Sequence, residues 1–500
     1  TTRAAQWGMK GKPNGARPTA GAQTTPRREH PVLHARLNMN HELKTAMINL
    51  LFSISVIVSI LSFGAVPDGT TDNAAAINKA IEFCHKKGRG IVVVPPGEFA
   101  TGSIHLRSGV TLRLDEGATL KGVQDLRAYT PLRTTADLSR YDSGLGTANA
   151  NSASDSIWSL ALIHIEDAAN VAITGRGTID GGHLLNPLGE ARQRGPHAIL
   201  IANAYQVGLE GISIKRAANY AILAYSIDKA IFSGLNIEEG WDGIHIRGGR
   251  HVIISDCRLA TGDDAIAGGY WDRMVISRCD INSSCNGIRM IQPSQHLTVK
   301  DCRFHGPGDF PHRTSGKTSS DAAISLEPGG WGPAPGRLDD IVLKNIDVKS
   351  MLTPLSVTLS EDNTLGRICV DHLVAHDITR MALSVKSWGT ARSEQVKIRH
   401  AVLEFRGIDD PSLPDWFKTH TTDQWPVFPS WAMYFRNVDH VSVKNVICSF
   451  TGKDYRKPIL YDHVGKIDIR RTHCRKSRSV DCKGNIRCQS LSSVFRRPPP

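Results

Sequence analysis

The sequence predicts an all-β fold, a right-handed parallel β-helix solenoid with an N-terminal capping helix. Three observations support this fold class: short strand-like segments repeat about every 22 residues, apolar residues alternate within each segment, and an amphipathic helix precedes the repeats. Leucine-rich repeats have a similar period, but their Leu/Asn pattern is absent from this chain.

The repeat is clearest in the middle of the chain. Its second apolar pair begins in successive units at intervals of 23, 22, 22 and 23 residues, at Ile212, Leu235, Cys257, Cys279 and Cys302. Similar segments continue on both sides, so we expect a β-helix catalytic domain over residues 63–469. Each coil would bury its apolar edge against the next coil.

The predicted capping helix lies in the stretch that begins at Asn73. Apolar residues share one face of this helix, and Lys-Lys-Gly at residues 86–88 is a helix stop. A β-helix leaves its end coil uncovered, so a helix at this point would shield the edge. The residues of the apolar face are Ala76, Ile77, Ala80, Ile81 and Cys84.

The positive charge of the chain is concentrated at its two ends. The net charge is +12, of which residues 1–45 carry +6 and residues 470–500 carry +8, which leaves −2 for the rest. Both ends have the composition of basic disordered segments, an extension over 1–45 and a tail over 470–500. The nearly neutral body argues against a nucleic-acid partner.

Residues 46–62 are predicted to be a signal peptide or a membrane anchor. Their apolar run is shorter than the roughly 20 residues that a membrane-spanning helix needs, which favours the signal peptide. We therefore expect a secreted or periplasmic monomer, with no membrane contact beyond a retained N-terminal anchor.

The ten cysteines leave two interpretations open. Cys257, Cys279 and Cys302 recur at the same place in successive repeats, which fits stacked inward thiols as well as disulfides. No cysteine pair has convincing zinc-site spacing, and no metal site is predicted.

Three aspartates are the candidate catalytic residues. Asp242 lies in Trp-Asp-Gly-Ile-His-Ile, and Asp263 and Asp264 lie in Thr-Gly-Asp-Asp-Ala-Ile-Ala, 21 residues later. This separation is about one coil, so the three carboxylates should meet on one face of a solenoid. Glycoside hydrolysis requires such clustered carboxylates. Turns that use Asp for local backbone hydrogen bonds are the simpler alternative.

Several motifs resemble family 28 glycoside hydrolases, the polygalacturonase group. They are Phe63-Gly-Ala-Val-Pro-Asp-Gly, Val94-Pro-Pro-Gly, Gly175-Arg-Gly-Thr-Ile-Asp-Gly and Thr261-Gly-Asp-Asp-Ala-Ile-Ala, within a likeness that covers roughly residues 63–350. The resemblance implies a metal-free, cofactor-free, inverting β-helix hydrolase of pectic polysaccharides. It also implies that Asp263 is the general acid and that Asp242 and Asp264 activate water.

The sequence departs from the family pattern at four places, the first of which is Gly240-Trp241-Asp242, where the family has Asn-Thr-Asp. His245 stands where an acidic residue is expected after Asp242, and Asn286 replaces the usual histidine. Ser325-Leu326-Glu327 stands where the family has Arg-Ile-Lys. Glu327 would repel a uronate in its subsite, which favours a neutral sugar there.

Other residues near these motifs are candidate substrate contacts. Arg289 could bind a sugar carboxylate bidentately or be a solvated surface arginine. His245 could position a hydroxyl, assist proton transfer or be structural. His312 and Arg313 lie in a loop that could line the cleft or face solvent.

Aromatic residues could stack on sugar faces. Tyr270 and Trp271 directly follow the Asp pair and are candidate substrate contacts. Segment 416–435 holds seven further aromatic residues, for which packing of a long loop onto the solenoid is the simpler use.

The predicted function is a secreted hydrolase that cleaves a pectic or related cell-wall polysaccharide or oligosaccharide. A β-elimination lyase on the same fold is one alternative, and it would require calcium and a basic Arg or Lys. A non-catalytic carbohydrate-binding β-helix is another, in which the aspartates only close turns.

Overall fold

The computed structural model describes residues 56–141, 151–415 and 427–476. All of the described residues belong to the second of two units of the chain, Ile54–Pro500. The predicted basic extension and most of the predicted basic tail lie outside the described residues. Within the described ranges, no helix is long and apolar enough to span a membrane.

Strands dominate the second unit. The helices are α2 (Ala74–Lys86) and the short 3-10 turns η1 (Ile60–Phe63), η2 (Leu126–Ala128), η3 (Ser139–Tyr141) and η4 (Glu190–Arg192). The strands up to the catalytic motifs are β1 (Ile57–Ser59), β2 (Gly90–Val94), β3 (Gly97–Thr101), β4 (Ile104–Leu106), β5 (Val110–Leu114), β6 (Ala118–Gly122), β7 (Ala161–Glu166), β8 (Ala169–Gly175), β9 (Thr178–Asp180), β10 (His197–Glu210), β11 (Ser213–Lys215), β12 (Ile222–Ser233) and β13 (Asn236–Glu238). The remaining strands are β14 (Ile244–Ser255), β15 (Arg258–Thr261), β16 (Ile266–Ser277), β17 (Asp280–Ser283), β18 (Ile288–Met290), β19 (Gln295–His305), β20 (Ala322–Leu326), β21 (Gly336–Leu338), β22 (Ile341–Lys349), β23 (Thr353–Leu359), β24 (Asn363–Ile378), β25 (Leu383–Ser387), β26 (Ser393–Arg406), β27 (Ser430–Thr451) and β28 (Lys457–Lys476).

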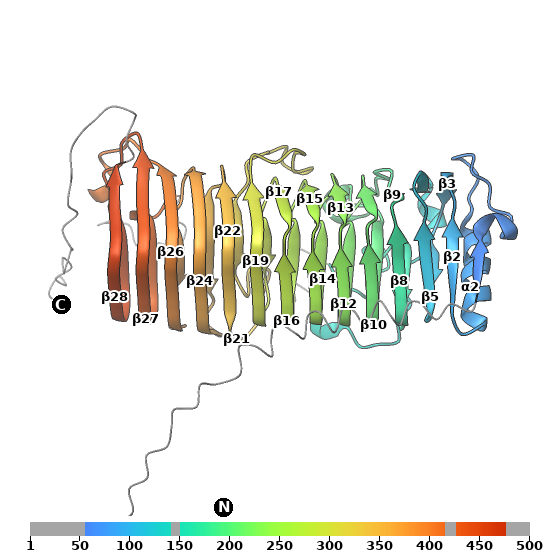
Figure 1. Cartoon of the computed structure of the whole chain (residues 1–500), viewed down its shortest axis with the longest axis horizontal. Helices are drawn as coiled ribbons and strands as arrows, with labels where there is room; N and C mark the ends of the chain where they lie inside the picture. Colours follow the sequence, from blue (N-terminus) through green and yellow to red (C-terminus); the bar gives the residue numbers. More distant parts are fainter. Residues whose placement is uncertain (1–55, 142–150, 416–426, 477–500) are drawn as a thin grey trace, which may run out of the picture. The chain divides into compact units, whose positions relative to one another are not determined.

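Each strand pairs in parallel with the equivalent strand of the next coil. One continuous ladder, seen face-on in Figure 1, runs β2, β5, β8, β10, β12, β14, β16, β19, β22, β24, β26, β27 and β28. Parallel neighbours can be joined only by a crossover, which here is the rest of the coil. The predicted parallel β-helix is confirmed.

The core is a column of stacked apolar side chains. Ile222, Ile244, Ile266, Ile288 and Ile324 are successive register partners, and each is at most 1% exposed. Strands buried in this way need apolar residues at every second position. This requirement explains why the alternation was visible in the sequence.

The predicted capping helix is confirmed as α2. Ile77, Ala80, Ile81 and Cys84 are buried on one face, and Ala76 is partly buried against the same core. The helix packs on η1, β2 and β4, at the first coils of the stack.

The β-helix extends beyond both predicted boundaries. Strand β1 pairs with β2, and Ile60 is fully buried, so the fold already includes residues 57–62. The predicted signal peptide or anchor overlaps the first coil there, because β1 pairs with β2 and the side chain of Ile60 enters the core. Residues 46–55 lie outside the described ranges, and the prediction for them stays untested. At the other end, β28 continues to Lys476, past the predicted limit at residue 469.

The recurring cysteines are stacked inward thiols. Cys257, Cys279 and Cys302 are each 2% exposed. The cysteines within the described ranges are all free, so for these residues the disulfide interpretation is wrong.

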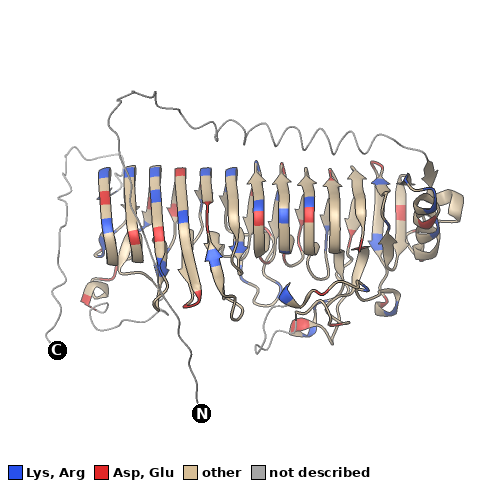
Figure 2. Cartoon of the chain, turned by 90° about the horizontal axis from the view of Figure 1, so that it is seen from below, with Lys and Arg blue, Asp and Glu red and all other residues tan. Residues whose placement is uncertain are grey.

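Charged side chains on the outer faces of the coils pair vertically. Lys and Arg are interspersed with Asp and Glu along the strands in Figure 2. Arg250 contacts Asp228 at 2.7 Å and Arg278 contacts Asp256 at 2.6 Å, in each case across one coil. Such exposed pairs contribute about 0 to 1 kcal/mol each, so we attribute most of the stability to the core.

The stacked isoleucines give a direct test of the core. Ile266→Ala is expected to lower the free energy of unfolding by about 2 to 5 kcal/mol, since it leaves a cavity between two coils. Chemical denaturation followed by circular dichroism measures this change. Val402→Ala, at a 37% exposed strand position, is the control and should change stability by less than about 1 kcal/mol. Equal effects would contradict the assigned core.

Candidate active site

The coil stacking brings the three candidate aspartates together. Asp242 precedes β14, and Asp263 and Asp264 precede β16, the next strand of the ladder. The backbone N–H of Gly243 donates to the Asp264 carbonyl at 3.0 Å, so Asp242 and Asp264 stack on consecutive coils. Oxygens of Asp263 and Asp264 lie within 4.8 Å of each other.

The three carboxyl groups differ in exposure. The side chains of Asp242 and Asp264 are 3% and 2% exposed, whereas that of Asp263 is 14% exposed. Burial, followed by repulsion from Asp263 and Asp264, holds the pKa of Asp242 well above its usual range. Burial likewise raises the pKa of Asp264 to about 6. These two groups are therefore the proton carriers of the cluster.

Asp263 is held in its ionised form by two neighbours. His312 Nε2 lies 3.5 Å and Arg194 Nη2 lies 3.4 Å from Asp263 Oδ2. Burial opposes ionisation of Asp263, but the His312 hydrogen bond and the Arg194 charge outweigh it, so the pKa of Asp263 is lowered. His312, predicted from the sequence as a cleft residue, thus touches a candidate catalytic group.

Asn286 positions Asp264. Its side-chain Nδ2 and its backbone N–H both donate to Asp264 Oδ1, at 2.8 and 3.0 Å. Its own Oδ1 accepts from the N–H of Ala322, which sets the orientation of the amide. Asn286 therefore hydrogen-bonds the Asp264 carboxylate, and it stands where the resemblance leads us to expect a histidine.

Asp242 is bound by a buried chain of donors. Arg247 Nε donates to His245 Nε2 at 3.1 Å, and His245 Nδ1 lies 2.6 Å from Asp242 Oδ2. An arginine can only donate, so the neutral imidazole must carry its proton on Nδ1 and donate to Asp242. Burial and the Arg247 charge lower the pKa of His245, which keeps the ring neutral. His245 is thus a positioning residue for Asp242.

Arg289 and Glu327 form an ion pair beside the cluster. Arg289 Nε donates to Glu327 Oε1 at 2.5 Å, and Arg289 Nη1 lies 3.7 Å from Asp264 Oδ2. Arg289 is therefore not a solvated surface arginine. Its charge balances that of Glu327, so the expected repulsion of a uronate by Glu327 is largely cancelled.

Trp331 covers the space between His245 and Arg289. These two residues stand two coils apart in one register column, with the small Ala267 between them. The Trp331 ring lies 6.0 Å from the His245 ring and 5.4 Å from the Arg289 guanidinium. A partly exposed indole here offers a face on which a sugar ring could stack.

Two predicted substrate contacts lie away from the carboxylates. Trp271 is 1% exposed and donates its indole N–H to the Ile246 carbonyl at 2.8 Å, so its assignment as a substrate contact is wrong. The preceding Tyr270 has φ 52°, which breaks the strand alternation and turns Trp271 into the core. Tyr270 itself packs on Tyr141.

The remaining predicted contacts are also accounted for. Arg313 contacts His183, whose other ring nitrogen binds Glu239, and it has no described contact with the aspartates. Of the aromatics in segment 416–435, the first three lie outside the described residues. Four others are buried, as expected for packing: Phe428, Trp431, Tyr434 and Phe435.

The described residues contain two clusters in which side-chain atoms that could bind a metal lie within 4.8 Å of one another. Asp371, His372 and His400 form one on an outer face, and Asp263, Asp264 and Cys285 form the other. Burial, together with the charges of Asp264 and Asp263, raises the pKa of Cys285, so it remains a protonated thiol. This chemistry makes the second cluster a weak metal site.

Sequence reasoning missed Arg194, Arg247, Tyr220 and Trp331. Tyr220 lies 22 residues before Asp242, and its ring stacks on His245 with centroids 4.8 Å apart. Extension of the repeat backwards by one coil could have found it. The Arg194 guanidinium lies 3.9 Å from the Trp241 ring centroid. Arg194 and Trp331 come from loops, where no periodicity marks them.

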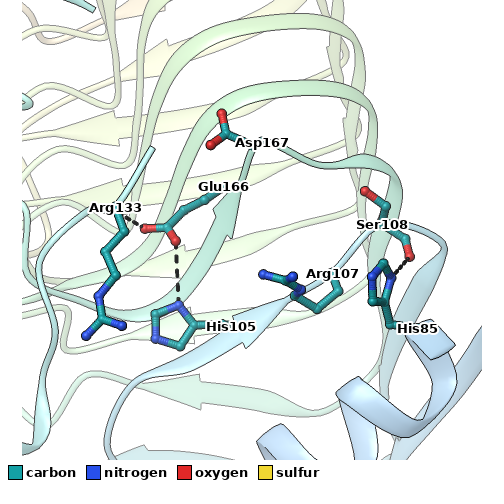
Figure 3. Close-up of a pocket in the computed structure, with 7 residues that line it drawn as sticks. All are labelled: His85, His105, Arg107, Ser108, Arg133, Glu166 and Asp167. Atoms are coloured by element: carbon teal, nitrogen blue, oxygen red, sulfur yellow. Dashed lines mark hydrogen bonds and ion pairs between the residues drawn. The ribbon is translucent and has the colours of Figure 1, made fainter. Parts of the chain in front are cut away.

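A separate polar pocket lies near the capping helix. Its volume is about 480 Å³, and none of the predicted site residues lines it. Glu166 is shared between the ring nitrogens of His105 and His164, at 3.7 and 3.3 Å, and it also accepts from the N–H of Arg133. Figure 3 shows the residues that line this pocket: His85, His105, Arg107, Ser108, Arg133, Glu166 and Asp167.

Comparisons with known proteins agree with this geometry. Residues 197–325 match the family described as right handed beta helix region, and residues 57–159 match rhamnogalacturonase A/epimerase, pectate lyase-like. An exo-poly-alpha-D-galacturonosidase of Dickeya chrysanthemi is 35% identical over 26% of this chain and 20% of its own length. The chain is similar to polygalacturonases over part of its length and at low identity. The resemblance predicted from the motifs is confirmed.

Two further comparisons show how far this polygalacturonase-like chain has diverged. A probable polygalacturonase of Vitis vinifera is 27% identical over 44% of this chain and 45% of its own length. The solved exopolygalacturonase of Thermotoga maritima shares the fold, with a TM-score of 0.55, 16% identity and coverage of 87% of this chain and 96% of its own. The chain matches less than half of the length of either curated relative.

The buried carboxyl of Asp242 should cost stability. Its pKa is raised in the folded protein, so folding is penalised increasingly as pH rises and the unfolded state becomes ionised. Asp242→Asn is expected to increase the free energy of unfolding at pH 7 by about 1 to 3 kcal/mol, and by less at pH 4. Denaturant titrations at both pH values measure this. A variant less stable at pH 7 would refute the assigned protonation.

Proposed function

We propose that this protein is a secreted glycoside hydrolase that cleaves a pectic or related cell-wall polysaccharide by an inverting acid/base mechanism. The main support is the carboxylate cluster, in which two groups with raised pKa lie beside one ionised group. Inversion needs one protonated and one ionised carboxyl on opposite sides of the sugar. The named polygalacturonase relatives support the substrate class.

Asp263 is our candidate for the general acid. It is the most exposed of the three carboxyls and can reach a glycosidic oxygen. In the free protein it is ionised, so a proton must first pass to it from Asp264, whose oxygens lie within 4.8 Å. The coupled cluster titrates as one unit, which allows this exchange.

Asp264 would then act as the base that activates the water, and Asp242, which keeps its proton, would help to orient that water by hydrogen bonding. After transfer, Asp264 is ionised and accepts a proton from the attacking water, while Asp263 gives its proton to the leaving oxygen. Asn286 and Arg289 stabilise the ionised form of Asp264. The donor chain Arg247 to His245 orients Asp242 in the same way.

The assignment of the acid has a specific test. Asp263→Asn is expected to lower kcat on the polysaccharide by about 10²- to 10⁴-fold. It should retain most of its activity on a nitrophenyl glycoside of the same sugar, because that leaving group needs no proton. Asp301→Asn, on an outer face, is the control and should retain full activity.

The same assay separates the alternatives. Proton NMR of the first products should show the inverted anomer. Undiminished cleavage of the polysaccharide by Asp263→Asn would reject this acid. Unsaturated, ultraviolet-absorbing products that require calcium would identify a lyase, and sugar binding without product release would identify a non-catalytic protein.

The role of Asp264 predicts a pH dependence. Its proton must pass to Asp263 before catalysis, so kcat/KM should fall as pH rises above about 6, the pKa of Asp264, where that proton is lost. Asn286→Ala removes a hydrogen bond to the carboxylate and raises this pKa, so the alkaline limb of the pH profile should move to higher pH. Asn363→Ala, a buried Asn with only backbone contacts, should leave the limb in place. An unmoved limb in Asn286→Ala would exclude Asp264 as the source of the proton.

A further inference from the structure

A small pocket adjoins the carboxylate cluster on its N-terminal side. Its volume is about 250 Å³, and it is formed by the loop before β7, the loop around η4 and the turn before β12. The lining residues used below are Asn151, Asp155, Glu190, Arg194 and Asn219.

Buried polar atoms without hydrogen-bond partners gather in this pocket. Within the described part of the chain, Asn151 Nδ2 and Arg194 Nη1 are unpaired donors and Asn219 Oδ1 is an unpaired acceptor. Arg194 Nε and Glu190 Oε2 form an ion pair at 3.4 Å without a hydrogen bond. Such groups are rare in folded proteins because each costs free energy, and their concentration around one cavity points to a polar ligand. A sugar hydroxyl can both donate and accept, so it suits this mixed set.

The pocket is continuous with the candidate catalytic residues. Arg194 lines it, and its Nη2 lies 3.4 Å from Asp263 Oδ2. Asn219 precedes Asp263 by 44 residues, or two coils, which places it about 10 Å along the stack. A sugar held in the pocket would therefore have its glycosidic bond near Asp263.

The charges of the pocket favour an uncharged sugar. Arg194 already faces two carboxylates, since its Nε lies 3.4 Å from Glu190 Oε2 and its Nη2 contacts Asp263. The Asp155 carboxylate accepts from the N–H of Ile157 at 2.8 Å and adds negative charge. A uronate would meet this excess of acidic groups without a free cation to bind its carboxylate.

We propose that this pocket is a subsite for one uncharged, hydroxyl-rich sugar residue next to the bond that is cleaved. This inference rests on the proposed function and narrows its substrate to a polysaccharide in which a neutral sugar occupies that position. Glu190 and Asn219 accept from the sugar hydroxyls, and Asn151 and Arg194 donate to them.

Binding of free monosaccharides tests the subsite without any hydrolysis. L-rhamnose, D-galactose and D-galacturonate are titrated into the unaltered protein, and affinity is measured by saturation-transfer NMR and calorimetry. A neutral sugar should bind at least tenfold more tightly than galacturonate. Asn151→Ala and Glu190→Gln should each weaken its binding about tenfold, the effect of about 1.4 kcal/mol, as for one hydrogen bond.

The control removes a similar ion pair elsewhere. Glu116→Gln breaks a surface pair with Arg176 at 2.5 Å and should not alter sugar binding. Galacturonate binding as tight as that of the neutral sugars, no binding of any of the three, or unchanged binding in both pocket variants would overturn the subsite. Loss of the hydrolase assignment would show instead as unsaturated products, or as no product release from polysaccharide, while sugar binding stayed unaffected.

Discussion

The hydrogen bonds between consecutive coils hold this structure in register, and the site depends on them. Gly243 N–H bonds the Asp264 carbonyl, and one coil later Ala265 N–H bonds the Asn286 carbonyl. These bonds place Asp242, Asp264 and Asn286 in one vertical column. Because strands one coil apart are about 4.8 Å apart, side chains of the column are forced into contact whatever their charge.

That enforced proximity explains the electrostatics of the site. Two carboxyls at consecutive levels cannot both be ionised cheaply in a buried place, so the pKa values of Asp242 and Asp264 are raised. The pKa of Asp263 is not raised in this way, because His312 from one loop and Arg194 from another lie beside its carboxylate. The coil stacking therefore holds the three carboxyl groups close together although they repel one another. Such an arrangement lowers the stability of the folded protein, as is common in active sites.

The structure shows which contacts the residues that depart from the polygalacturonase pattern make. The acidic residue replaced by His245 would have added a fourth carboxyl, whereas the imidazole donates to Asp242. Glu327, which replaces a cation, is neutralised by Arg289. The histidine missing at Asn286 has a counterpart in His312, which reaches Asp263 from the loop after β19. The replacements therefore leave each of the three aspartates with a hydrogen-bond donor or cation beside it.

The sequence by itself determined the fold and the stacking of the candidate catalytic aspartates. Period, alternation and the 21-residue spacing of Asp242 and Asp263 follow from local backbone geometry that every coil repeats, and these are visible in one dimension. Trp271 was misplaced because the left-handed backbone at Tyr270 reverses the alternation, which no composition rule reveals. Only the tertiary structure shows that Arg194 and Trp331 lie at the candidate site. Loop sequences have no periodicity that would mark such residues. Their side chains also reach the site across several coils, so only the folded structure shows which groups they contact.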